Sequence, residues 1–76
     1  MKERILKQMQ DVINEKSIVL YSDSVLSDVL DSITFIKMVV ALESEFNFEF
    51  DDEMLLITKF PTTDSMIKYV ESKINI

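Results

Sequence analysis

The chain has 76 residues, 47% of them apolar, with one Pro, no Gly, no Cys and no His. That length accommodates one small domain, and the missing Cys and His exclude disulfide scaffolds, zinc fingers, Cys-His nucleophile pairs and Ser-His-Asp triads. The net charge of −6 arises mainly in residues 17–53, which hold nine acidic residues against a single base, Lys37.

Charge and hydropathy also bear on partners and location. Nucleic-acid binding requires a basic surface, so the acidic middle of the chain argues against a nucleic-acid partner and favours a basic protein. The N-terminus is charged through Lys16, unlike a signal peptide, and the longest apolar run, residues 38–42, is far shorter than the roughly 20 residues of a membrane span. We therefore expect a cytoplasmic monomer without a membrane span.

The first predicted helix covers residues 2–16, where apolar side chains recur at helical spacing. They are Ile5, Leu6, Met9, Val12 and Ile13. Residues 17–31 show no clear period, and we expect a long loop there. Residues 18–21 would also suit a short strand, but the chain offers no convincing second strand to pair with them. The loop is expected to be anchored in the core by Leu20, Leu26 and Leu30.

The strongest helical pattern covers residues 32–46, and Asp31-Ser32 offers a cap at its start. This helix has two apolar faces. The face expected in the core consists of Phe35, Met38, Val39, Leu42 and Phe46. The other face, formed by Ile33, Ile36 and Val40, is either buried in a crowded small core or exposed as a docking surface.

Residues 46–50 alternate between apolar and polar side chains, a pattern typical of a strand. Because no partner strand is evident, we expect an extended connector that Phe48 and Phe50 attach to the core. The three acids at 51–53 are then expected to begin a short helix over residues 54–57.

Phe60-Pro61 ends that element, and Thr62-Thr63-Asp64 opens the last helix. Its expected buried face consists of Met66, Ile67, Val70 and Ile74. The predicted fold is all-α: a small four-helix bundle of three longer helices and one short helix, with a long first loop, in a single domain over residues 1–76.

Asp31-Ser32 is the first candidate for chemistry. By itself such a pair is most commonly a helix cap. A phosphate on Ser32 would nevertheless meet free N–H groups and the positive end of the helix dipole. Ser32 has no His to act as its base, so another enzyme must modify it. No metal site is predicted, because residues 22–33 lack the Gly and the final Glu of a calcium-binding EF-hand loop.

Three segments in order resemble the phosphopantetheine carrier proteins. They are Asp31-Ser32-Ile33, the run ALESEFNFEF at residues 41–50, and Phe60-x-x-Thr63. In that family an Asp-Ser-hydrophobic tripeptide opens a helix that an A-L-E-x-x-F segment closes, followed by an acidic turn, a short helix and a last helix. The resemblance runs from about Leu26 to Ile74 and implies an acyl-carrier-protein-like fold.

The resemblance implies that Ser32 carries a 4′-phosphopantetheine arm, installed from coenzyme A by a phosphopantetheinyl transferase. Asp31 would assist transferase recognition as well as cap the helix. The protein would hold an acyl or aminoacyl group as a thioester on that arm, without being an enzyme itself. A loading enzyme (an adenylating enzyme or an acyltransferase) and a downstream synthase or transferase would bind a surface made of Ile33, Ile36, Val40, Glu43 and Glu45.

Two departures from the family pattern bear on the pathway. Val29 stands where many members have Gly, and residues 34–38 include no acid, whereas fatty-acid carriers tend to place acids there. Both features favour a dedicated polyketide, nonribosomal peptide or related pathway. The start Leu30-Asp31-Ser32 resembles the stand-alone D-alanyl carriers and some discrete peptidyl carriers. A housekeeping fatty-acid carrier and a D-alanyl carrier stay open as alternatives, as does a small acidic helical interaction module without a prosthetic group. A hydrolase is opposed by the missing general base.

Overall fold

The structure is a computed structural model that describes residues 2–13, 19–21 and 23–74. It contains four helices: α1 (Lys2–Ile13), α2 (Leu26–Val29), α3 (Ser32–Phe46) and α4 (Thr63–Ile74). Two 3-10 turns, η2 (Asp52–Met54) and η3 (Ile57–Lys59), lie between α3 and α4. The described ranges contain no strand beyond one isolated bridge between Val25 and Thr62, which confirms the predicted all-α fold.

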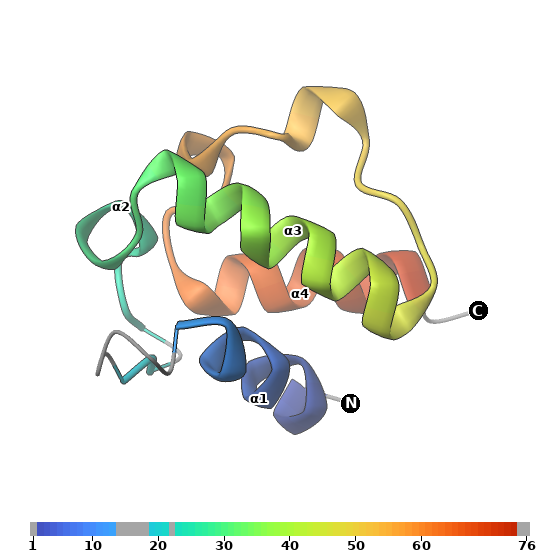
Figure 1. Cartoon of the computed structure of the whole chain (residues 1–76), viewed down its shortest axis with the longest axis horizontal. Helices are drawn as coiled ribbons and strands as arrows, with labels where there is room; N and C mark the ends of the chain where they lie inside the picture. Colours follow the sequence, from blue (N-terminus) through green and yellow to red (C-terminus); the bar gives the residue numbers. More distant parts are fainter. Residues whose placement is uncertain (1, 14–18, 22, 75–76) are drawn as a thin grey trace.

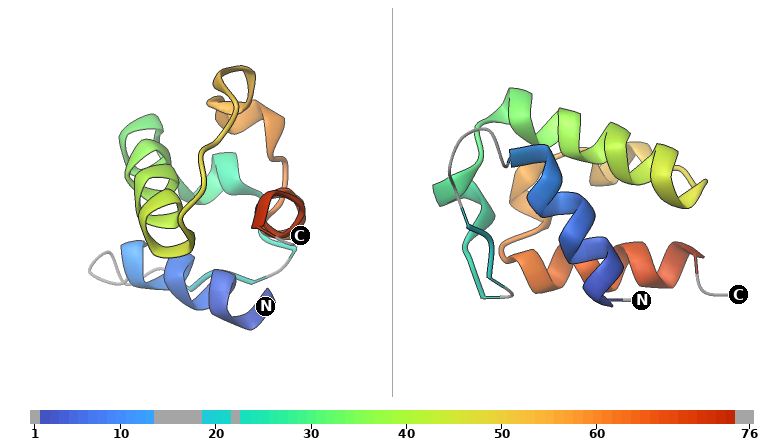
Figure 2. Two further views of the ribbon diagram at one scale, coloured as in Figure 1. Left: turned by 90° about the vertical axis from the view of Figure 1, so that its right-hand side faces the viewer. Right: turned by 60° about the horizontal axis from the view of Figure 1, so that its bottom comes forward.

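The three longer helices surround a common interior. Seen along α4, helices α1, α3 and α4 occupy three sides, and the segment between α3 and α4 arches over the fourth (Figures 1 and 2). Besides its buried apolar face, α1 contacts its neighbours through two cationic side chains: the Arg4 guanidinium lies 5.4 Å from the centre of the Phe46 ring, and Lys2 pairs with Asp64 at 3.4 Å. No helix within the described ranges is long and apolar enough to cross a membrane.

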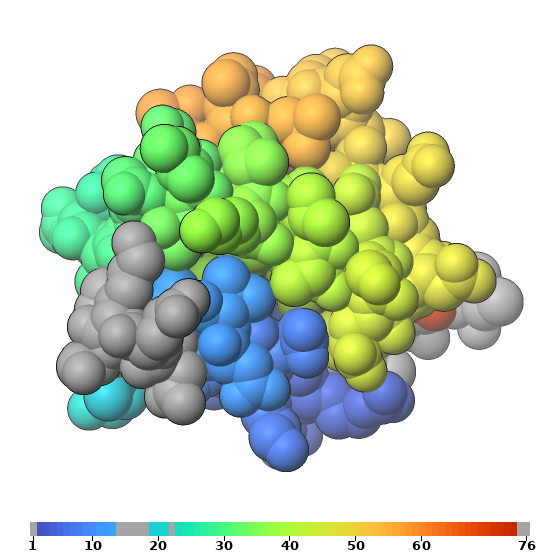
Figure 3. Space-filling view, viewed as in Figure 1, coloured from blue at the N-terminus to red at the C-terminus, as the bar shows by residue number. Residues whose placement is uncertain are grey.

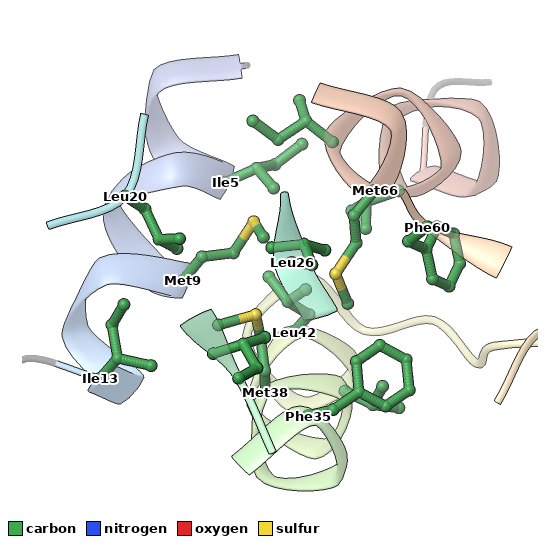
Figure 4. Packing of buried hydrophobic residues seen from close by; sticks show 14 of the residues in the cluster. Ile5, Met9, Ile13, Leu20, Leu26, Phe35, Met38, Leu42, Phe60 and Met66 are labelled. Atoms are coloured by element: carbon green, nitrogen blue, oxygen red, sulfur yellow. The ribbon is translucent and has the colours of Figure 1, made fainter. Parts of the chain in front are cut away.

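The core follows the predicted helical faces (Figure 4). Every longer helix contributes its predicted apolar stripe, and the three leucines of the first loop are buried as expected. Four of the predicted residues, Leu6, Val12, Phe46 and Ile74, are only partly buried and pack against the edge of this core. The fully or nearly fully buried residues include Ile5, Met9, Ile13, Leu20, Leu26, Leu30, Phe35, Met38, Val39, Leu42, Met66, Ile67 and Val70.

Two segments were predicted wrongly. The predicted loop over residues 17–31 contains the short helix α2, and the short helix predicted at residues 54–57 is instead the pair of turns η2 and η3. The cause in the second segment is local: Leu56 has an extended backbone (φ −132°, ψ 132°), which interrupts the helix after one turn. The predicted end of the first helix at residues 14–16, and the start of the loop at residues 17–18, lie outside the described residues.

The connector after α3 is extended, as predicted, and aromatic side chains hold it. Asn47 ends α3 in the left-handed conformation (φ 55°), which Asn tolerates better than most residues. The Phe50 ring is buried and lies 5.9 Å from Phe60 and 5.1 Å from Tyr69, centre to centre. Phe48 packs beside Phe50 at 5.3 Å, so these rings attach the connector to the core.

Candidate functional site

The segment that leads into α3 is tied to the segment that leads into α4. The Leu26 N–H donates to the Pro61 carbonyl (3.1 Å), and the Thr63 N–H donates to the Ser24 carbonyl (3.0 Å). Leu26 and Leu30 are buried on either side of the α2 turn. These contacts fix the path of the chain immediately before Asp31.

Asp31 is the N-cap of α3, as predicted. Its Oδ1 accepts a hydrogen bond from the Thr34 N–H (2.7 Å), and its backbone carbonyl accepts from the Phe35 N–H (2.9 Å). The N–H groups of Ser32 and Ile33 belong to the first turn, where no intrahelical carbonyl can reach them. Neither N–H has a partner among the residues that the structure describes, so the helix presents two donors and the positive end of its dipole at Ser32.

Ser32 is exposed at the first position of α3, and its hydroxyl makes no hydrogen bond within the described residues. Two other serines follow an aspartate, and both are half-buried with occupied hydroxyls. The Ser24 Oγ accepts from the Tyr21 N–H (2.9 Å), and the Ser65 Oγ donates to the Thr62 carbonyl (2.6 Å). Of the three Asp-Ser pairs, only the one at 31–32 offers an accessible, uncommitted hydroxyl.

The second apolar face of α3 is exposed. Ile33, Ile36 and Val40 have 68%, 45% and 57% of their surface accessible, so the alternative of burial in a crowded core is wrong. We call these three residues the apolar strip. The outer surface of α3, coloured green, crosses the middle of the molecular face shown in Figure 3. The strip begins directly beside Ser32 and continues along the helix.

A shallow hollow of about 350 Å³ lies at the Ser32 end of the strip, bordered by Ser32, Ile33, Ile36 and Lys37. Lys37 was not among the predicted site residues. The sequence could have pointed to Lys37 through its spacing, because Lys37 follows Ile33 by four residues and therefore lies beside it on the helix surface. It is also the only base in residues 17–53.

The structure separates the two predicted glutamates. Glu43 is half-buried near the far end of the strip, where its Oε2 accepts a hydrogen bond from the Phe50 N–H (2.8 Å). Glu45 follows Ile33 by twelve positions, so it is displaced from Ile33 by about a third of a turn around the helix axis. It borders a different hollow with Arg4 and Lys7 of α1. Glu43 thus helps hold the connector, and Glu45 lies beside α1 rather than on the strip.

The site fits a covalently attached, surface-borne group. An arm joined through a phosphodiester needs an accessible hydroxyl, tolerance for a negative charge and open space, and the start of α3 offers all three. The exposed carbons of Ile33 and Ile36 offer an apolar floor next to the attachment point. Nothing in the described surroundings of Ser32 blocks such a group.

Comparison with known proteins gives one match. No curated protein and no solved structure matches the chain. The family model described as the phosphopantetheine attachment site matches residues 3–70, which include nearly all of α1, all of α2 and α3, and most of α4. With this match over most of its length, the chain belongs to the phosphopantetheine carrier family and bears 4′-phosphopantetheine as a covalent prosthetic group.

Proposed function

We propose that Ser32 is the attachment residue of the arm and that residues 1–76 act as a single carrier domain. The observation that carries this proposal is the state of the three Asp-Ser hydroxyls. Ser24 and Ser65 are half-buried and hydrogen-bonded, whereas the Ser32 hydroxyl is exposed, uncommitted and aligned with a helix N-terminus. A transferase can reach Ser32 without unfolding any element.

The transfer itself requires an external catalyst. The Ser32 Oγ forms a bond to the phosphorus that carries pantetheine in coenzyme A, and the pyrophosphate linkage breaks. Adenosine 3′,5′-bisphosphate leaves, and a base on the transferase takes the hydroxyl proton, because this chain has no His to do so. Asp31 contributes by holding the helix start, and its exposed position next to Ser32 would let the transferase recognise it.

Once attached, the arm supplies a thiol that holds acyl or aminoacyl groups as thioesters. The chain's own residues then present that cargo. The apolar strip of Ile33, Ile36 and Val40 is a small exposed surface next to the arm, suited to brief contacts with several enzymes in turn. Glu43 lies at the far end of the apolar strip. Glu45 lies beside α1, so only a partner that covers both the strip and the edge of α1 would contact it.

The partners fall into three classes: the phosphopantetheinyl transferase, a loading enzyme that is an adenylating enzyme or acyltransferase, and a downstream synthase or transferase. The first turn of α3 carries no acid, and Lys37 follows within the next turn. This charge pattern supports a dedicated polyketide, nonribosomal peptide or related pathway over housekeeping fatty-acid synthesis. Lys37 places one positive charge near the arm, whereas the rest of residues 17–53 holds no base.

The absence of cysteine permits a direct test with a thiol reagent. The arm-free chain, made by chemical synthesis, should give no thiol signal until it is incubated with coenzyme A and a broad-range transferase, and should then give about one thiol per chain after the coenzyme is removed. Ser24→Ala and Ser65→Ala should gain the thiol like the parent, whereas Ser32→Ala should gain none. A thiol on Ser32→Ala, or none on the parent, would refute the proposal.

A further inference from the structure

We propose that the Lys37 ammonium binds the phosphodiester at Ser32, so that the first part of the arm lies across Ile33 and Ile36. This inference rests on the proposed attachment at Ser32. It assigns a function to the one base of α3, which the general carrier role does not require.

The arrangement on the helix surface brings these groups together. Ser32, Ile33, Ile36 and Lys37 border the same hollow. With about 100° of rotation per residue, Ser32 and Lys37 lie at its opposite edges, and the two isoleucines lie between them. Side chains on a helix lean towards its N-terminus, so the long Lys37 side chain leans back towards the turn that holds Ser32.

The charges at the start of α3 favour this contact. A phosphodiester on Ser32 carries one negative charge and stands next to the Asp31 carboxylate, which is already engaged with the Thr34 N–H. Two neighbouring negative charges increase the attraction for a nearby cation. Lys37 is exposed and makes no ion pair with any described residue, and its ammonium offers three donors to phosphate oxygens.

The apolar floor of the hollow suits the part of the arm next to the phosphate. The pantetheine arm continues from its phosphate into a carbon that bears two methyl groups, before its first amide. Ile33 and Ile36 are exposed in this structure, so covering them with those methyl groups removes apolar surface from water. The ion pair and the apolar contact would together bias the arm to lie along α3 rather than project freely from it.

The contact can be tested on the holo-protein by ³¹P NMR of the phosphodiester. The resonance should shift between the parent and Lys37→Gln, and should stay unchanged in Lys59→Gln, which removes the same charge from an exposed residue of η3 outside the hollow. Lys37→Arg should retain most of the parental shift. Raising the salt towards 1 M should move the parent resonance towards that of Lys37→Gln, because the Debye length shortens to about 3 Å and the ion pair is screened.

The path of the arm can be tested separately with a nitroxide attached to its thiol. In the parent, paramagnetic broadening should be strongest at the backbone amides of residues 33–40. In Lys37→Gln this broadening should fall by up to about fivefold, since an exposed ion pair shifts an equilibrium by roughly 1.4- to 5-fold. In Lys59→Gln the broadening should resemble that of the parent.

Identical ³¹P shifts and identical broadening in the parent and Lys37→Gln would overturn the proposal. Peptide mass mapping of each holo-variant first establishes where the arm is attached. An arm on a residue other than Ser32 would contradict the proposed function, whereas an arm on Ser32 that ignores Lys37 would contradict only this inference. If Lys37→Gln fails to fold, Lys37→Arg and the salt series on the parent still test the ion pair, and a parent resonance that does not move with salt would overturn the proposal.

Discussion

At the scale of single residues, Asp31 and Ser32 have separable tasks although they are adjacent. The Asp31 side chain closes the first turn of α3 through Thr34, and Ser32 leaves its hydroxyl free. The sequence alone favoured Ser32 by its family pattern. The hydroxyls of Ser24 and Ser65 bond to backbone groups only three residues earlier, but the sequence does not show whether these short segments adopt the turns that bring the groups together.

Capping by Asp31 predicts a measurable stability cost. Asp31→Ala should lower the free energy of unfolding by about 0.5–2 kcal/mol, because the Thr34 N–H loses its acceptor. Asp31→Asn should keep most of the stability, since an amide oxygen also caps, while slowing arm transfer if the transferase reads the carboxylate. Urea unfolding measures the first effect and thiol gain the second. Asp28→Ala, an exposed acid of α2, is the control; an Asp31→Ala variant as stable as the parent would contradict the capping role.

At the scale of elements, α3 divides into a buried face and an exposed face. Its bounds were predicted correctly because fifteen residues contain several complete helical periods. Helix α2 was missed because four residues contain barely one turn, and because its first N–H is satisfied by Pro61, thirty-five positions away in the chain. The hydrogen bond from Phe50 to Glu43 was missed for a related reason, since it depends on where the connector turns back.

The two faces of α3 predict opposite effects for neighbouring substitutions. Phe35 is 2% exposed and packs against Phe60, so Phe35→Ala should cost about 3–5 kcal/mol of stability. Ile36→Lys should melt close to the parent, because the side chain is exposed, yet should be loaded poorly by a partner enzyme that contacts the strip. Thermal melts compare the stability of the two variants, and steady-state loading compares their use by the partner enzyme. If Ile36→Lys unfolds the domain while Phe35→Ala does not, the faces are assigned backwards.

At the scale of the whole molecule, one polar cluster ties the connector to the last helix. Asp51 accepts a hydrogen bond from the Tyr69 hydroxyl (2.9 Å) and pairs with Lys73 (3.2 Å), and its own N–H donates to the Tyr69 oxygen (3.0 Å). The hydrogen bonds from Tyr69 and Lys73 hold the pKa of Asp51 below its ordinary value. Neither neighbour was expected from sequence, since both lie about twenty residues away.

This cluster predicts a pH-dependent contribution to stability. Because the pKa of Asp51 is lowered in the folded chain, the contribution is complete above the unfolded value of about 3.9 and is lost as the pH falls through the folded value. Asp51→Asn should therefore be less stable than the parent at pH 7, with the difference disappearing in strong acid. Melts across this range test it against Asp52→Asn, whose side chain makes no ion pair in the described part of the chain. A constant difference for Asp51→Asn would contradict the account.

The central claim is that this acidic four-helix chain carries a single phosphopantetheine arm on Ser32. The most direct measurement is the mass of the intact protein after co-expression with a broad-range transferase, followed by fragmentation to locate any added mass. The account predicts a species heavier by one arm, with the added mass on Ser32 and none on Ser24 or Ser65. A protein that gains no mass under conditions where a known carrier is modified, or gains it at another residue, would contradict the claim.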